Sequence, residues 1–437
     1  MVSFIPINTS ISSESPCTPY TRVGIHVIGN DVLLVVRYLY KYCSKTIPLS
    51  SRLIPPFWSK LSIILKGEEN CIPLPFNRFR SEWCGVEQGR FYLVSGASKS
   101  SKTQLTNYIF VYNTILFAYY NKGVISPKIF YYNLEETKEN ITLRFISFLL
   151  NRIYGIHISP TELNSTNADA PVPEEILQKI NEGEIKDILD FYEQVMDFRP
   201  SSNPTGVYKD VLSYAKCNGK EVRKKYSYKD EWGQLKEGET FDYYIPNNPR
   251  EYIFIIVDHV SLLSPEKICP TLREAINKLT EYLVMFRNRY NYIPVVVQQQ
   301  NMESISLEAF KNDRIAPVLS GLADSKDTGK ACDVMIGILN PFSFQLKEKF
   351  GYDITRSKGN FRSMEIVLNR AGQSNGVCPL LFDGAINRFD ELCLPNNKVE
   401  LEKIYKYLDK IRNKQTVNTT ISMFICGIIK RVKDLLE

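Results

Sequence analysis

A lysine and a threonine at the end of a run of small residues indicate a phosphate site. The segment follows an apolar run and consists of Gly96, Ala97, Ser98, Lys99, Ser100, Ser101, Lys102 and Thr103. Backbone N–H groups at such a turn can surround phosphate oxygens, and a helix N-terminus adds a partial positive charge. We expect Lys102 to reach the terminal phosphates of a nucleotide and the Thr103 hydroxyl to hold Mg²⁺.

The segment departs from the usual G-x-x-x-x-G-K-[ST] pattern at one position, because Ser101 stands where the second glycine is expected. Serine carries a Cβ atom, so it adopts a left-handed backbone less easily than glycine does. Taken alone, the segment is equally compatible with an ordinary turn from strand to helix. Residues 104–121 carry apolar side chains at helical spacing, which places the segment at such a junction.

Polar side chains also end three further apolar runs, at Glu135, Asp258 and Gln299. Beside a phosphate site, Glu135 could polarise the attacking water, Asp258 could hold Mg²⁺, and Gln299 could sense the terminal phosphate. Simpler roles exist for each of them. Glu135 could be an N-cap or first-turn acid for a helix that begins near Thr137, and the other two could be ordinary strand ends.

The elements that would position these side chains are short apolar runs that alternate with longer amphipathic segments. Most of the runs are apolar throughout, which is typical of strands buried on both faces of a parallel sheet. Thr271 and Glu274 form a capping-box pattern before a helical stripe. The sequence therefore predicts an α/β fold with a mostly parallel central sheet flanked by helices. Its predicted strands are Phe91–Ser95, Lys128–Leu134, Tyr252–Asp258, Pro294–Gln299, Val334–Leu339, Met364–Asn369 and Pro379–Phe382.

The division of the chain follows changes in this rhythm. Residues 1–70 are predicted as a small, partly helical N-terminal region with a flexible start, and residues 71–395 as the main α/β domain. Within that domain, residues 200–250 interrupt the pattern with a helix from about Pro204 and an inserted β-hairpin turning at 230–234. Residues 396–437 are predicted as a C-terminal helical tail.

The composition restricts the class of protein. The chain has 437 residues, 44% of them hydrophobic, and a formal charge of +6, which permits a nucleic-acid partner without establishing one. Its 10 cysteines include no C-x-x-C pair and only 3 histidines could join them, so structural zinc is not expected. No apolar run approaches the roughly 20 residues of a membrane helix. We expect a cytoplasmic protein with reduced thiols and no membrane partner.

The order of the motifs resembles that of the DnaB-like replicative DNA helicases, whose motor is a RecA-like P-loop ATPase. The resemblance covers residues 72–389 and implies ATP and Mg²⁺ as cofactors. It also implies that Glu135 is the catalytic base, that Asp258 holds the metal, and that Gln299 couples the nucleotide state to DNA. The segments that carry it are Ile72–Phe76, Gly96–Thr103, Asn133–Glu135, Val257–Leu263, Gln299, Leu319–Ser325, Ala331–Val334, Asn369–Gly376 and Leu381–Phe389.

The later segments of the resemblance imply a DNA-gripping loop and an arginine finger. The loop contains Asp324, Lys326 and Lys330, which are otherwise interpreted as solvated loop charges. Arg370 would act on the nucleotide of a neighbouring subunit in a ring, and its simpler role is that of a surface arginine. Two departures concern these segments: Leu368 stands where the family has a lysine, and Ala323 stands where it has an arginine.

The function predicted from the sequence is an ATP-dependent replicative DNA helicase. The resemblance implies a hexameric ring that moves 5′ to 3′ on single-stranded DNA, with a primase or helicase loader as further partners. The first 70 residues are shorter than the family's collar domain, which suggests a divergent member, with the host cytoplasm as its place if it is viral. One alternative is a RecA-, RadA- or KaiC-like ATPase that does not unwind DNA. Another, motivated by Ser101 and Leu368, is a non-hydrolysing assembly factor that binds nucleotide or DNA.

Overall fold

The computed structural model describes residues 71–164, 171–301 and 315–410, and all of them belong to one compact unit, Glu68–Glu437. The predicted N-terminal region and the end of the predicted C-terminal tail lie outside the described residues. No helix of the described part of the chain is long and apolar enough to cross a membrane.

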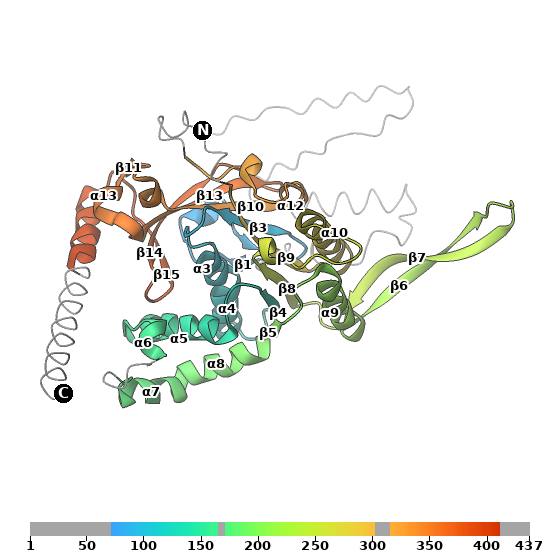
Figure 1. The fold of residues 1–437 in the computed structure, drawn as a ribbon. Coiled ribbons are helices and arrows are strands. Elements are labelled where there is room, and N and C mark those ends of the chain that lie inside the picture. The colour runs from blue at the N-terminus through green and yellow to red at the C-terminus, as the bar shows by residue number, and fades with distance from the viewer. Residues whose placement is uncertain (1–70, 165–170, 302–314, 411–437) are drawn as a thin grey trace, which may run out of the picture. The chain divides into compact units, whose positions relative to one another are not determined.

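A nine-stranded sheet forms the centre of the unit, in the order β15-β14-β13-β10-β3-β9-β8-β4-β5 (Figure 1). The strands from β10 to β5 are mutually parallel, while β13, β14 and β15 continue the sheet in antiparallel fashion. All seven predicted strands are present in it, so the prediction of an α/β fold with a mostly parallel sheet is confirmed. The strands are β3 (Tyr92–Gly96), β4 (Ser126–Asn133), β5 (Met196–Arg199), β8 (Glu251–Asp258), β9 (Ile293–Gln299), β10 (Val334–Leu339), β13 (Phe361–Asn369), β14 (Val377–Asp383) and β15 (Arg388–Glu391).

Successive residues of a strand point to opposite faces of the sheet. Because the residues on both faces are apolar here, helices cover both faces. In β3, Tyr92 and Val94 join one buried cluster with the helices α3, η3, α4, α5 and α8, while Leu93 joins a second cluster with α9 and α10. Both faces of the sheet are therefore buried, which explains why these strands are apolar along their whole length. The helices are α3 (Lys102–Thr106), the π-helix η3 (Asn107–Tyr112), α4 (Asn113–Tyr120), α5 (Lys138–Tyr154), α8 (Gly183–Val195), α9 (Pro204–Cys217) and α10 (Leu272–Tyr290).

Strand register brings the predicted site segments to one edge of the sheet. Gly96 at the end of β3 pairs with Gln299 at the end of β9, and Asn133 at the end of β4 pairs with Asp258 at the end of β8. The carboxyl ends of parallel strands form the usual ligand edge of an open α/β sheet. Helix α10 begins with the predicted capping box, in which the Thr271 side chain accepts a hydrogen bond from the Glu274 backbone.

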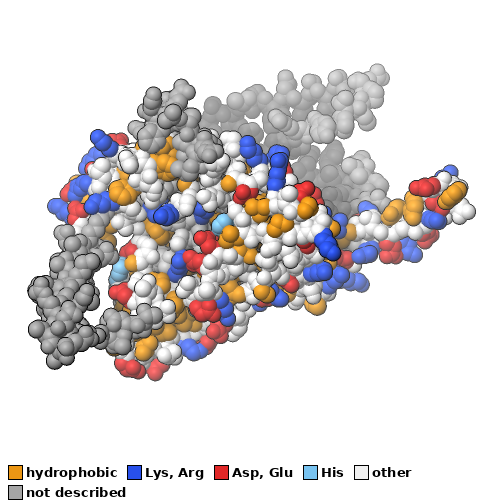
Figure 2. Space-filling model, in the orientation of Figure 1, with side chains coloured by type: hydrophobic (Ala, Val, Ile, Leu, Met, Phe, Trp, Pro, Cys, Tyr) orange, Lys and Arg blue, Asp and Glu red, His pale blue; other side chains and the backbone are white. Residues whose placement is uncertain are grey.

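A long hairpin follows α9, in the segment where the sequence predicts an insertion. Strands β6 (Gly219–Lys229) and β7 (Leu235–Pro246) pair along their whole length, and Asp230 Oδ1 accepts hydrogen bonds from the backbone of Trp232 and Gln234 in the turn. The base is fixed by Tyr244, which is buried against α10. The distal half extends away from the sheet with hydrophobic and charged side chains mixed along it, and Trp232 at its tip is 85% exposed (Figures 1 and 2).

Smaller elements complete the unit. The short strand β1 pairs with β2 beside α4, and residues 398–410 form a helix whose Leu401 and Tyr405 pack against Tyr352 and Phe361. The remaining elements are β1 (Ile72–Pro73), η2 (Phe79–Ser81), β2 (Gly85–Val86), α6 (Pro160–Leu163), α7 (Glu174–Asn181), η4 (Val260–Leu262), η6 (Leu319–Gly321), α12 (Asp327–Ala331), η7 (Pro341–Phe344), β11 (Glu348–Lys349), β12 (Tyr352–Asp353), α13 (Ile354–Ser357) and η8 (Lys358–Asn360).

Candidate functional site

The predicted phosphate segment forms the turn between β3 and α3. Ser101 is the residue before the helix and has φ 75° and ψ 35°, and Lys99 is also left-handed with φ 59°. The serine therefore adopts the conformation for which glycine is preferred, despite its Cβ atom. Gly96 is needed for a different reason, because a Cβ atom there would lie 2.3 Å from the Ile338 carbonyl oxygen and 2.6 Å from Ser100 Oγ.

The inside of this turn carries polar groups whose hydrogen-bonding capacity is not used. Ser100 Oγ is buried and has no partner among the described residues. The Lys102 ammonium group donates a hydrogen bond of 3.0 Å to the Ala97 carbonyl oxygen, and burial lowers the pKa of Lys102. Ala97 is partly exposed and Ser98 is exposed. A cation held by a neutral carbonyl and a buried hydroxyl without a partner fit an anion at this turn.

Asp258 and Thr103 meet beside the turn. Thr103 Oγ1 lies 3.1 Å from Asp258 Oδ1, and the hydroxyl of Tyr131 lies 3.2 Å from Asp258 Oδ2 and 3.0 Å from Asn107 Oδ1. Asp258 is 2% exposed, and its burial raises the pKa of the carboxyl group to about 6. Hydroxyl and carboxylate oxygens are the ligands that Mg²⁺ prefers, so this pair fits such an ion. Asn107 begins the π-helix η3, an element often found at functional sites.

Glu135 is neither the N-cap nor a first-turn residue of α5. Thr137 is the N-cap and accepts a hydrogen bond from the Asn140 backbone, while Glu136 pairs with Arg144 at 2.7 Å. The side chain of Glu135 remains 55% exposed, with Oε2 3.8 Å from His259 Nε2. The negative charge of Glu135 also acts on Lys102, where it partly offsets the lowering of the Lys102 pKa by burial. The helix-capping alternative for this glutamate is therefore wrong.

Three successive glutamines connect β9 with the loop that was predicted to grip DNA. Gln299 lies beside Gly96 in the sheet, and its carbonyl oxygen accepts a hydrogen bond of 2.9 Å from the Ala323 backbone. Gln298 is buried, donates hydrogen bonds to the carbonyl oxygens of Ala323 and Ser325, and accepts one from Thr328. Backbone and side-chain bonds together thus hold residues 323–328 against the strand next to the phosphate turn.

The three residues predicted to contact DNA occupy different surroundings. Asp324 is exposed and accepts a hydrogen bond from Ser261, which places it near the site, since it also acts on the pKa of His259. Lys326 is exposed at the start of α12, and Lys330 is exposed on the same helix, where its ammonium group pairs with Asp327 at 2.7 Å.

Arg370 lies at the edge of the sheet opposite to the phosphate turn. Val334 pairs with both Tyr92 and Asn369, whereas Ile338, four residues later, pairs with both Gly96 and Met364. Because β13 runs antiparallel to β10, Arg370 therefore follows the end of β13 that lies beside the start of β3. Its guanidinium group donates to the carbonyl oxygens of Cys332 and Lys330. This arginine does not contribute to the phosphate turn of its own chain.

Four residues at the site were not predicted to contribute to it: Tyr131, His259, Gln298 and Arg362. The first three lie within or next to segments that the sequence analysis identified, so their positions give a signal. Arg362, at the start of β13, donates hydrogen bonds to Ser100 and Ser101 across 261 or more residues of sequence. Nothing in the local sequence indicates that contact.

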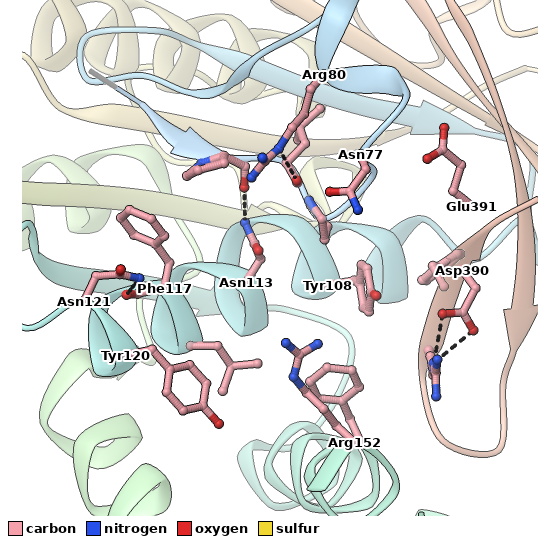
Figure 3. Close-up of a pocket in the computed structure, with 17 residues that line it drawn as sticks. Asn77, Arg80, Tyr108, Asn113, Phe117, Tyr120, Asn121, Arg152, Asp390 and Glu391 are labelled. Atoms are coloured by element: carbon pink, nitrogen blue, oxygen red, sulfur yellow. Dashed lines mark hydrogen bonds and ion pairs between the residues drawn. The ribbon is translucent and has the colours of Figure 1, made fainter. Parts of the chain in front are cut away.

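A separate cavity of about 640 Å³ lies away from these residues. Figure 3 shows Asn113 and Tyr120 of α4 and Arg152 of α5 around it, and Asn113 donates a hydrogen bond of 2.8 Å to the Pro73 carbonyl oxygen. None of the predicted site residues lines this cavity. The candidate site is therefore the turn at the carboxyl edge of the sheet and not this cavity.

Comparisons with known proteins give similarity in fold. No protein-family model and no curated protein matches the chain. Among solved structures, one ATPase domain has 13% identity, covers 77% of this chain and 98% of its own, and gives a TM-score of 0.49. The second structure is that of a DnaB-like replicative helicase and its interactions with primase, and it is 12% identical to this chain. The match covers 83% of this chain and 73% of the helicase chain, with a TM-score of 0.53. At a TM-score of 0.53, the chain shares the fold of this DnaB-like replicative helicase.

Proposed function

We propose that this protein is an ATP-dependent DNA helicase of the DnaB-like type. The contact between Thr103 Oγ1 and Asp258 Oδ1, 3.1 Å long, is the observation that carries the proposal. It joins the first turn of the helix after a phosphate turn to the carboxylate at the end of β8, which β9 separates from β3 in the sheet. A hydroxyl and a carboxylate in this arrangement can bind Mg²⁺, and the lysine next to them can bind the phosphates of a nucleoside triphosphate.

The residues divide the work of hydrolysis between binding and proton transfer. The backbone of residues 96–101 and the Lys102 ammonium group would bind the phosphates. Thr103 and Asp258 would hold Mg²⁺, whose positive charge would offset negative charge on the phosphate oxygens. Glu135, free of any capping role, accepts the proton of the attacking water. His259 Nε2 lies 3.8 Å from the Glu135 carboxylate.

The coupling to DNA is proposed to run through β9. Gln299 lies beside the phosphate turn, and its carbonyl oxygen holds the backbone of Ala323 in the loop that contains Asp324 and Lys326. A change at the terminal phosphate would thus reach residues that contact single-stranded DNA. Lys326 and Lys330 would contribute phosphate contacts, whose strength falls as salt is raised.

Assembly into a ring is proposed from the position of Arg370. In its own chain this arginine lies at the opposite edge of the sheet from the phosphate turn, so only a second copy can place it on a nucleotide. We further propose, by analogy with DnaB-like helicases, a hexamer that moves 5′ to 3′, with a primase or a loader as further partners.

Phosphate release in the presence of single-stranded DNA tests the hydrolysis step. Lys102→Ala and Glu135→Gln are each expected to lower turnover by at least about 100-fold, because general-base catalysis alone contributes roughly 10² to 10⁴. Lys267→Ala and Glu139→Gln change exposed side chains of the same types and serve as matched controls. Turnover that survives both site substitutions would exclude this site as the ATPase centre.

Strand separation tests the motor. ATP-driven unwinding of a forked duplex, abolished by Lys102→Ala, is expected of a helicase. Strand exchange without unwinding would instead identify a recombination-type ATPase on the same fold. Nucleotide binding without phosphate release would identify a non-hydrolysing assembly factor.

A further inference from the structure

Arg362 is a buried arginine at the phosphate edge of the sheet. Met364, two residues later, pairs with Ile338, which in turn pairs with Gly96 at the end of β3. The antiparallel direction of β13 therefore brings its first residues to the turn that precedes α3. Arg362 is 5% exposed, and its guanidinium group lies 4.9 Å from the centre of the Phe382 ring.

The hydrogen bonds of this guanidinium group all go to neutral oxygens. Nε lies 3.2 Å from the Ser100 carbonyl oxygen and 3.2 Å from Ser101 Oγ, while Nη2 lies 3.1 Å from the same Oγ. Nη1 donates to the carbonyl oxygens of Gly359 and Phe361 at 2.7 and 2.8 Å. Within the described part of the chain no carboxylate pairs with it, and burial lowers the pKa of Arg362 to about 10. A buried charge without a counter-ion is costly, and an anion at the adjacent turn would compensate it.

Ser101 is the residue through which this charge can act. A serine hydroxyl has two acceptor lone pairs and one proton to donate. The two N–H groups of Arg362 occupy the lone pairs, so the Ser101 O–H can only donate, and no acceptor for it exists among the described residues. The same contacts hold the side chain of a residue with φ 75°, where the pattern of phosphate loops calls for glycine.

We propose that Arg362 and Ser101 form a phosphate-binding unit of this chain, in which Arg362 fixes Ser101 in the left-handed conformation and directs its hydroxyl proton to the bound polyphosphate. The proposal rests on the ATP site proposed above and adds a donor that a glycine could not supply. Arg362 is a positioning residue, because it acts through Ser101 and not on the substrate. A hydroxyl polarised by a guanidinium group and aimed at a phosphate is a charge-assisted donor.

A double-mutant cycle tests this pairing, with Ser101→Gly, Arg362→Gln and the double variant. We measure the affinity for the slowly hydrolysed analogue ATPγS by calorimetry, and KM and kcat by phosphate release. Each single substitution is expected to weaken binding and raise KM about tenfold, the effect of one hydrogen bond to a charged group. kcat should stay within about threefold, because ground state and transition state both lose this contact.

The double variant gives the decisive result. Arg362→Gln is expected to weaken ATPγS binding less than about threefold in the Ser101→Gly background, because the hydroxyl that the arginine positions is then absent. Equal tenfold effects in both backgrounds would overturn the proposal and leave Arg362 a packing residue. Arg287→Gln is the matched control, since this partly buried arginine pairs with Asp333 at 3.0 Å at the far edge of the sheet. It should lower stability without changing ATPγS affinity.

The unmodified protein separates this inference from the proposed function. Absence of ATPγS binding to the unmodified chain would contradict the ATP site itself. Binding by the unmodified chain, together with additive effects in the cycle, would contradict only the role of Arg362 and Ser101. Arg362→Lys is a further check, because lysine keeps the charge but cannot donate two hydrogen bonds to one hydroxyl oxygen from a fixed planar group. It should recover less than half of the ATPγS binding free energy that Arg362→Gln loses.

Discussion

Gln298 offers a direct test of how the phosphate edge holds the predicted DNA loop. The side chain is fully buried and makes three hydrogen bonds, as donor to the carbonyl oxygens of Ala323 and Ser325 and as acceptor from Thr328. Gln298→Met keeps the length of the side chain and removes all three bonds. Thr328→Val removes only one of them.

The expected magnitudes follow from this count. A buried hydrogen bond contributes about 1 kcal/mol net to stability. Gln298→Met should therefore lower the free energy of unfolding by about 3 kcal/mol, and Thr328→Val by about 1 kcal/mol. The double variant should lose about 3 kcal/mol and not the sum, because the two side chains share one of the bonds.

Denaturant unfolding and DNA-stimulated phosphate release provide the two measurements. Stimulation by single-stranded DNA should be reduced in Gln298→Met more than turnover without DNA, because the loop and not the phosphate turn has lost its support. Gln178→Met, on the exposed surface of α7, is the control and should change stability by less than about 0.5 kcal/mol. Additive losses in the double variant, or equal losses in the two single variants, would refute the reasoning.

Three further predictions concern assembly, the core and the hairpin. Arg370→Ala should lower phosphate release by roughly 10³-fold or more, as loss of an arginine finger does. Mixing this variant with Lys102→Ala should restore measurable turnover, because some interfaces then combine an intact Lys102 with an intact Arg370 from the other subunit. No recovery on mixing would place the finger in cis or exclude it. Phe145→Ala removes a fully buried ring that stacks on Tyr192 with centroids 5.0 Å apart, and should cost about 3–5 kcal/mol in denaturant unfolding. Trp232→Ala at the hairpin tip should change the midpoint very little, since the indole is 85% exposed, and a large shift there would mean that the hairpin packs on something.

The strands could be predicted from the sequence because a strand buried on both faces is a continuous apolar run. Their parallel order then places their carboxyl ends on one edge, so the meeting of Thr103 with Asp258 follows from local patterns and one topological rule. Strand β5 could not be found in this way, because Asp197 and Arg199 break the apolar pattern in a strand of only four residues. The roles assigned to the site residues stay predictions until they are measured.

The direction of β13 could not be predicted, because apolar runs look alike in parallel and antiparallel strands. That direction decides which end of β13 faces the phosphate turn, and it therefore separates Arg362 from Arg370. The left-handed Ser101 was likewise unexpected, since its stabilising partner comes from a distant strand. Sequence patterns thus located polar groups at the ends of single elements, whereas long-range pairing decides which of the two arginines lies at the phosphate turn.

Strand β13 also sets a fixed spacing. Arg362 lies at its start and Arg370 follows its end, at most about 27 Å apart at about 3.4 Å per residue, since an irregularity at Val367 shortens the strand. In the proposed ring, one strand would link the nucleotide of its own subunit to that of the next, so its length would set the interval between successive sites. Inserting one residue would turn the following side chains to the opposite face, whereas inserting two would keep the faces and lengthen the interval by about 7 Å. The length of β13 would then have to match the distance between the nucleotide sites of neighbouring subunits.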